Sequence, residues 1–283
     1  MRPTFSIITT AYNRGYVVWK AIQSAQKQVY PYFELLVIDD GSTDNTKQIV
    51  AEFQKDPRIK YFKIKHAGGS IARNYGLLHA KGNIITYIDS DDYVYENFLT
   101  VPLEFFKKFP KKVFAIPNYN RRLELYDKDF HLVDFVKSSS EQKANITLQD
   151  FFHWNIKTCG TGIFHKKETL KKVKWDPKIP RAQDWDFIMS LGNAYPNGFM
   201  HIPYVLFEYQ QTYGTNSMCS SAKSYNEWAD CFEKMYRKHK DDPLMKGQKW
   251  YPAKITKYKN LQKLFEEGKV PPPQYKDFPK FFK

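Results

Sequence analysis

The sequence contains little cysteine and no long apolar run. Its three cysteines, Cys159, Cys219 and Cys231, are widely spaced, and no CxxC pair occurs among the 283 residues. An odd cysteine count argues against a disulfide framework and favours a reducing compartment. No window reaches the roughly 18 apolar residues that a transmembrane helix needs, and the first apolar segment is too short and too early for a secretory signal. These absences predict a cytoplasmic protein with no transmembrane segment.

Positive charge, by contrast, is plentiful. The chain has 44 basic and 30 acidic residues, which gives a net charge of +14, and residues 221–283 alone carry 15 basic and 8 acidic residues. This excess favours an anionic partner: a lipid headgroup layer, a nucleic acid or an acidic glycan. A lysine-rich composition without any such partner explains the charge equally well, because 36 of the basic residues are Lys and most are scattered.

Strand-like and helix-like segments alternate through the first ninety residues. Apolar, β-branched runs predict strands, and apolar residues at helical spacing predict helices between them. The strands are expected at 4–10, 33–38, 59–64 and 84–88, and the helices at 16–28, 45–53 and 71–79. This alternation is typical of a parallel sheet with helices on both faces. Ligands of such sheets bind beyond the carboxyl ends of the strands.

The fourth strand is followed at once by three carboxylates, Asp89, Asp91 and Asp92. Clustered carboxylates repel one another, so the arrangement makes sense if a cation lies among them. Oxygen ligands suit Mg²⁺ or Mn²⁺, and Mg²⁺ is usually held by one or two carboxylates together with substrate phosphates. The alternative is that Asp91 or Asp92 caps a following helix. Polar clusters at 10–14 and 39–44 end two further strands and favour a shared site at one edge of the sheet.

Four segments in register resemble the inverting family-two glycosyltransferases of the GT-A fold: Ser6–Asn13, Val37–Asp44, Ala72–Gly76 and Ile88–Asp92. The resemblance covers about residues 4–210. It implies an α/β fold, Rossmann-like, with a mostly parallel central sheet and helices on both faces, followed by a basic C-terminal tail, helical or extended. The expected organisation is a nucleotide-sugar-binding half at 1–100, an acceptor-binding half at 101–220, and a basic aromatic helix and tail at 221–283.

The resemblance also implies a nucleotide diphosphate sugar as donor, most often a UDP-sugar, and Mn²⁺ or Mg²⁺ as cofactor. Within the motif, Tyr12 matches a position near the base, Asp39 an acid that hydrogen-bonds the base, and Asp91 the ligand of the metal that bridges the diphosphate. Asp92 is expected to be structural. The donor-binding positions carried over from the family are Thr10, Tyr12, Asn13, Asp39, Arg73 and Asp89.

An inverting transfer needs a general base that takes the proton of the acceptor hydroxyl. The run Gln183–Phe187 resembles the family's acidic element near the acceptor, which makes Asp184 the expected base and Asp186 a cap or supporting group. The alternative is that both acids only favour the N-terminus of a helix. Trp154 and Trp185 are candidates for an acceptor platform, although aromatic residues more often form core.

The sequence departs from the family pattern at two places. The family's Tyr-Arg-x-x-His, whose His is a further metal ligand, has no counterpart at 208–217, so a water or Asn216 is expected instead. His66 stands where Asn-x-Gly is more usual, and either touches the donor or is an exposed loop residue.

The activity so implied is sugar transfer to a surface-glycan or lipid-linked precursor at the inner face of the membrane. The basic tail would then lie on anionic lipid. One alternative keeps the enzyme class but makes a modified nucleic-acid base the acceptor, with the tail on phosphates. Another is an inactive GT-A-like binding module, against which the intact Asp89, Asp91 and Asp184 argue.

Overall fold

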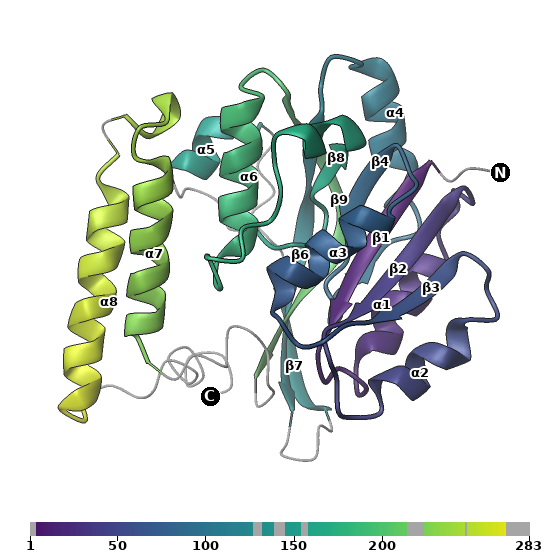
Figure 1. Cartoon of the computed structure of the whole chain (residues 1–283), viewed down its shortest axis with the longest axis horizontal. Coiled ribbons are helices and arrows are strands. Elements are labelled where there is room, and N and C mark those ends of the chain that lie inside the picture. The colour runs from purple at the N-terminus through teal and green to yellow at the C-terminus, as the bar shows by residue number, and fades with distance from the viewer. Residues whose placement is uncertain are drawn as a thin grey trace.

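The computed structural model describes residues 4–126, 132–138, 145–153, 158–213, 224–246 and 248–269, with side chains left out at 123–126, 132–138 and 211–213. Within these residues the chain forms one nine-stranded sheet and eight α-helices (Figure 1). The strand order along the sheet is β3-β2-β1-β4-β8-β6-β9-β5, and β7 pairs with β6 beside this path.

The first half confirms the predicted alternation of strands and helices. Strands β1, β2, β3 and β4 are parallel neighbours, with Phe5 opposite Phe33 on one side and Ile84 on the other. Connecting helices take the chain back to the start of each next strand, so all four strands end at the same edge of the sheet. The elements are β1 Phe5–Ala11, α1 Val18–Gln26, β2 Phe33–Asp39, α2 Thr46–Phe53, β3 Ile59–Lys63, α3 Gly69–His79 and β4 Ile84–Tyr87.

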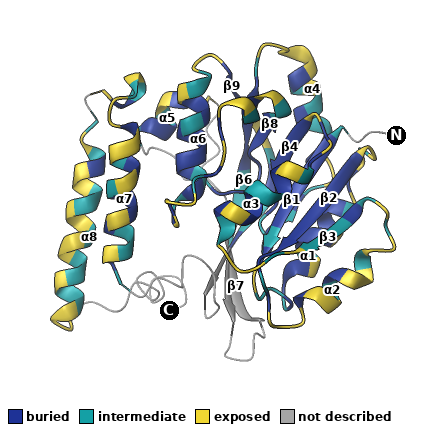
Figure 2. Cartoon of the chain, viewed as in Figure 1, coloured by how far each residue is buried: buried dark blue, intermediate teal, exposed yellow. Residues whose placement is uncertain are grey.

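Both faces of the sheet are buried, and successive residues of a strand serve opposite faces. Ile8 and Leu36 belong to the core that includes residues of α3 and α6, whereas Ile7 and Leu35 belong to the core that includes residues of α1 and α4. Burial on both faces explains why these strands read as continuous apolar runs and not as alternating ones. In Figure 2 the central strands are accordingly dark blue along most of their length.

The second half is mixed and less regular. Strand β8 pairs antiparallel with β4 and β6, while the long β6 and β9 run parallel to each other. Sequence patterns predict a strand at 113–116 and a hairpin over 123–136. The antiparallel pairing of β6 with β7 confirms the hairpin, and pairing with β9 joins its first strand to 113–116 as one long strand. The predicted hairpin turn at 127–129 lies outside the described residues. The elements are β5 Tyr93–Val94, α4 Thr100–Lys108, β6 Phe114–Tyr126, β7 Leu132–Ser138, α5 Leu148–Phe152, β8 Phe164–Lys166, α6 Gln183–Ala194 and β9 Phe199–Tyr213.

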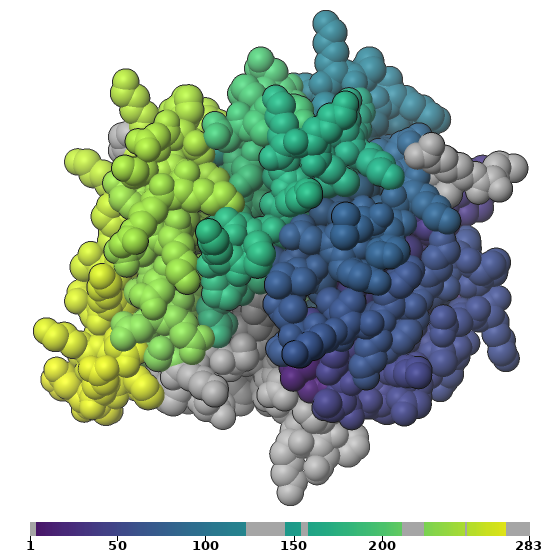
Figure 3. Space-filling model, viewed as in Figure 1, coloured from purple at the N-terminus to yellow at the C-terminus, as the bar shows by residue number. Residues whose placement is uncertain are grey.

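Two helices, α7 (Asn226–His239) and α8 (Trp250–Glu266), follow the sheet. Apolar residues at helical spacing predict the first helix, at 225–239, whereas α8 falls in the basic tail that was expected to be helical or extended. Its apolar side, with Tyr251 fully buried, is interleaved with lysines, which hides the periodicity. Figures 1 and 3 show both helices beside the segment around α6 and away from the N-terminal half. Residues 270–283, expected to be extended, lie outside the described residues, and among the helices described, none could cross a membrane.

Candidate active site

The loop after β1 is joined to the loop after β2 by hydrogen bonds, and each loop donates to the other. Asn13 has a left-handed backbone (φ 52°), which Asn adopts more readily than most residues. Its backbone N–H donates to Ser42 Oγ at 2.9 Å, and its Oδ1 accepts from the backbone N–H of Thr43 at 2.8 Å. The backbone N–H of Gly15 donates to Asp44 Oδ2 at 2.9 Å. Asn13, a predicted donor-binding residue, thus fixes the two loops that the donor residues occupy.

Asp39 at the end of β2 is fully buried and already bonded. Oδ1 accepts from the backbone N–H of Ser42 at 2.7 Å, and Oδ2 accepts from the hydroxyl of Tyr61 at 2.5 Å. Burial, together with the Asp39 carboxylate, raises the pKa of Tyr61, so the phenol remains a donor. Each carboxylate oxygen has two lone pairs, so Asp39 retains acceptor capacity for a nucleobase.

Asp40 organises the loop that follows β3. Its two oxygens accept from the backbone N–H groups of Ala67 at 2.8 Å and Gly68 at 2.9 Å, and His66 Nδ1 lies 2.9 Å from Oδ2. The His66 ring stacks on Tyr12 with centroids 4.0 Å apart, while Tyr12 keeps 41% of its surface exposed. Sequence reasoning left His66 open between a donor contact and a solvent-exposed loop residue. The structure shows an exposed loop residue, with 54% of the His66 side chain accessible, whose ring stacks on the residue predicted near the base.

Asp89 and Arg73 form an ion pair at the end of β4. Arg73 Nη2 donates to Asp89 Oδ1 at 2.8 Å, and Nη1 donates to Gln183 Oε1 at 2.7 Å. The guanidinium also lies over the ring of Trp175, 4.6 Å from its centroid. Arg73 therefore connects the end of β4 to the first residue of α6. Asp89 and Gln183, which are far apart in the sequence, are thus bridged by the Arg73 side chain.

The turn that precedes β8 packs against Asp89. Thr161 Oγ1 accepts from the backbone N–H of Asp89 at 2.8 Å and donates to Asp92 Oδ2. A Cβ on Gly160 would lie 2.8 Å from both carboxylate oxygens of Asp89, so only glycine fits here without a shift. No sequence motif assigned this turn a role in the site.

The three acids after β4 are in different environments. Asp92 is fully buried and accepts from the backbone N–H of Gln210 at 2.8 Å, which holds β9 beside the turn. Burial, and then the charges of Asp91 and Asp89, raise the pKa of Asp92. Asp89 and Asp91 are only half-buried. Asp92 is therefore a structural acid, as expected, and the other two are accessible to a ligand.

Arg14 was missed by sequence reasoning. It follows the family-like run in the loop after β1, and its Nη1 donates to the hydroxyl of Tyr16 at 2.8 Å. Burial acts to lower the pKa of Arg14, but Asp91, the hydroxyl of Tyr16 and Asp89 together outweigh it and raise that pKa. The guanidinium is thus a second cation, besides Arg73, beside the half-buried acids.

Asp184 lies in the first turn of α6, close to the Asp89–Arg73 pair. Burial, and then the negative charge of Asp89, raise the pKa of Asp184 to about 7, against the opposing effect of Arg73. The residue two positions earlier, Ala182, has a left-handed backbone (φ 51°). A carboxyl that ionises near pH 7 in such a site has the property expected of a general base.

The other residues predicted for the site are Thr10, Trp185, Trp154 and Asn216, and the structure describes only the first two. Thr10 is half-buried in β1, opposite Ile38. Trp185 is 4% exposed and packs edge-on against Phe151, which argues for a role in the core. Trp154 and Asn216 lie outside the described residues. Among the residues that are described, no three His, Cys, Asp or Glu side chains are grouped to hold a metal without substrate oxygens.

Comparison with known proteins places this site in a family. The model of glycosyl transferase family 2 matches residues 6–169, more than half of the chain. The chain belongs to glycosyltransferase family 2. WcaA of Escherichia coli K12, named provisionally as a colanic acid biosynthesis glycosyl transferase, is 28% identical over 247 residues, which is 84% of this chain and 82% of WcaA. An uncharacterized glycosyltransferase of Rickettsia conorii is 42% identical over 103 residues, 36% of this chain but only 17% of that protein.

Solved structures of glycosyltransferases have the same fold. S. aureus TarS 1–349 in complex with UDP-GlcNAc superposes with a TM-score of 0.68 at 19% identity, covering 99% of this chain and 76% of that one. The mannosyltransferase PcManGT of Pyrobaculum calidifontis, in complex with GDP-Man and Mn²⁺, gives a TM-score of 0.58 at 16% identity, covering 92% and 75%. This glycosyltransferase therefore has the GT-A fold, as predicted.

Proposed function

We propose that this glycosyltransferase is a metal-dependent, inverting enzyme that transfers a sugar from a nucleotide diphosphate donor, most often UDP-linked, to an acceptor hydroxyl. The observation that carries the proposal is the position of Asp184, whose pKa is raised to about 7 next to the Asp89–Arg73 pair. The UDP-GlcNAc and GDP-Man complexes of TarS and PcManGT support a nucleotide-sugar donor.

The proposed chemistry is a single displacement. The ionised Asp184 accepts the proton of the acceptor hydroxyl while the acceptor oxygen forms a bond to the anomeric carbon. The bond between that carbon and the nucleotide diphosphate breaks on the opposite face, so the anomeric configuration inverts. Arg14, beside Asp89 and Asp91, contributes positive charge where the departing diphosphate gains negative charge. Tyr12, exposed and backed by His66, offers a flat ring to the nucleobase.

The donor set at the end of β4 fits Mg²⁺ or Mn²⁺. Asp89 and Asp91 offer carboxylate oxygens and are half-buried, and Asp91 would hold the ion together with diphosphate and water oxygens. Mg²⁺ is commonly held in this way, by one or two carboxylates together with substrate phosphates and not by a full protein cage. When bound, such an ion neutralises charge on the leaving diphosphate.

The proposed acceptor is a surface-glycan or lipid-linked precursor, with the protein on the cytoplasmic face of an anionic membrane. The support is the charge of the C-terminal helices: residues 243–265 contain six lysines and no acidic residue. Lys249, Lys257, Lys259 and Lys263 are exposed there. Binding to anionic vesicles but not to DNA of equal charge density, at the same salt, is expected, and the reverse would favour a nucleic-acid acceptor.

The function is tested by donor turnover. Release of free nucleotide from UDP-, GDP- and dTDP-sugars is measured with Mn²⁺, with Mg²⁺ and with chelator, in wild type and in Asp184→Asn. One donor class should be turned over with metal only, and Asp184→Asn should lose the transfer while still binding the nucleotide. Turnover that survives chelation or that survives Asp184→Asn would contradict the proposal.

A further inference from the structure

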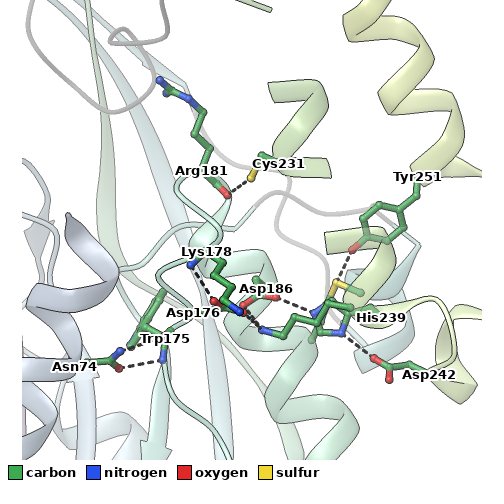
Figure 4. Close-up of polar contacts among 12 residues, drawn as sticks. Asn74, Trp175, Asp176, Lys178, Arg181, Asp186, Cys231, His239, Asp242 and Tyr251 are labelled. Atoms are coloured by element: carbon green, nitrogen blue, oxygen red, sulfur yellow. Dashed lines mark hydrogen bonds and ion pairs between the residues drawn. The ribbon is translucent and has the colours of Figure 1, made fainter. Parts of the chain in front are cut away.

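The segment that carries Asp184 is held on both sides by helix α7. On the side before Asp184, the backbone carbonyl of Arg181 accepts from Cys231 Sγ at 2.8 Å (Figure 4). The guanidinium of Arg181, a residue only 7% exposed, donates to Glu227 Oε2 at 2.6 Å and lies over the ring of Trp228. Three residues of α7 thus fix the position of Arg181.

On the side after Asp184, Asp186 is 1% exposed and bonded at both oxygens to α7. Oδ1 lies 2.8 Å from His239 Nε2, and Oδ2 accepts from Lys238 Nζ at 2.8 Å. His239 is itself buried, and its Nδ1 lies 2.8 Å from Asp242 Oδ2. Figure 4 shows this series of contacts from α6 to the end of α7. A buried carboxylate needs such partners, because it is costly when unpaired.

Between these two anchors the backbone is strained and bonded to the donor side. Ala182 adopts a left-handed conformation (φ 51°), which costs a non-glycine residue about 1 kcal/mol or more and persists only where its surroundings determine it. Its neighbour Gln183 accepts from Arg73, the partner of Asp89. The segment 181–186 therefore joins α7 on one side to the donor residues on the other.

We infer that α7 is a positioning element for Asp184, acting through His239 on Asp186 and through Glu227 on Arg181. This inference rests on the proposed role of Asp184 as base. Helix α7 lies outside the residues 6–169 that define the family domain here. Apolar contacts would also attach α7, but two-point hydrogen bonding to a buried carboxylate fixes the register of the first turn of α6 as well. Displacement of a reacting group by about 1 Å can cost about 100-fold in rate.

The test compares His239→Leu with His239→Gln and Arg237→Gln. The leucine removes both ring nitrogens, whereas the glutamine amide can still donate to Asp186. Arg237 is the matched control, because it lies on the same helix, 74% exposed, and pairs only with Glu233 among the interactions described. Far below the unfolding temperature, His239→Leu should lower kcat about tenfold or more with an unchanged KM for the donor. His239→Gln should recover most of this loss, and Arg237→Gln should match wild type.

Glu227→Gln provides a second variant that does not alter the buried histidine, and it too should lower kcat and leave the donor KM unchanged. If His239→Leu does not fold, Glu227→Gln and His239→Gln decide the question. Wild-type kcat in both Glu227→Gln and His239→Leu, or a loss that the glutamine does not restore, would overturn the inference. Failure of the proposed base is separable, because Asp184→Asn would then keep its kcat whatever α7 does.

Discussion

Strands β2 and β4 both end in adjacent carboxylates at the same edge of the sheet, yet the two ends serve different purposes. At the end of β2, Asp39 and Asp40 are buried, and their oxygens are bonded to backbone N–H groups and to Tyr61. At the end of β4, Asp89 and Asp91 are half-buried, with Arg73 and Arg14 beside them. The same residue type at equivalent places holds loops together in one case and is half-buried beside two cations in the other.

The difference shows how to separate structural from functional acids. A carboxylate whose oxygens already accept backbone N–H bonds stabilises the fold, and its removal leaves buried donors unpaired. A carboxylate that is half-buried beside side-chain cations, as Asp89 and Asp91 are, can take a metal ion as a further partner. Mutation of Asp91 should therefore remove activity and spare stability, and mutation of Asp40 should do the opposite.

The largest expected effect is on Asp91→Ala. Loss of this carboxylate should lower metal-dependent turnover by about 10³-fold, because charge on the leaving diphosphate is no longer neutralised. The unfolding temperature without ligand should change little, since the side chain is half-buried. Turnover and thermal unfolding measured on one preparation check both statements, and a large loss of stability would contradict the assignment.

Next in size is the effect of pH and of Asp184→Asn. Because the pKa of Asp184 is raised to about 7, the rate should rise with pH through 7 and level off above it. Asp184→Asn should lower kcat by about 100-fold or more at the plateau.

The same carboxyl should also affect stability. Because its pKa is raised in the folded state, the free energy of unfolding should fall as pH rises from about 4 to 7. The asparagine variant, which has no such carboxyl, should lose less stability over that range; a wild-type rate profile flat from pH 5 to 8 would contradict this account.

At the β2 end, Asp40→Ala should destabilise the fold by about 2 kcal/mol, because the N–H groups of Ala67 and Gly68 lose their acceptor. Chemical denaturation measures the loss. Turnover per folded molecule should fall far less than in Asp91→Ala. An Asp40→Ala protein of normal stability but no activity would break the comparison between the two strand ends.

The smallest expected effect is on Tyr12→Ala. Removing the Tyr12 ring from the Tyr12–His66 stack should weaken nucleotide binding by about 1 kcal/mol, which is about fivefold. Titration calorimetry with the free nucleotide diphosphate checks this, with Tyr32→Ala, an exposed tyrosine outside this stack, as the control. Equal affinities in the two variants would remove Tyr12 from the proposed base site.

Sequence patterns predicted β1 to β4 because each strand is short, apolar and bounded by polar loops, and because local spacing alone separates strands from helices there. Asp89, Asp91 and Asp184 could be nominated from motif positions. Arg14 and Thr161 could not, since their roles depend on partners that meet only after folding. The continuity of β6 between 116 and 123, and the choice of a helix over an extended chain at α8, were not predictable for the same reason: pairing with β9 joins the one, and packing on α7 selects the buried side of the other.

The most direct test of the contrast between the strand ends is thermal unfolding with UDP and GDP, each with and without Mn²⁺, in wild type, Asp91→Ala and Asp40→Ala. A ligand that binds only the folded state adds about 2.7 kcal/mol of stability at 100 times its Kd. We predict a Mn²⁺-dependent shift with one nucleotide in wild type and in Asp40→Ala, although the latter unfolds at a lower temperature, and no shift in Asp91→Ala. A shift retained in Asp91→Ala and lost in Asp40→Ala would contradict the account.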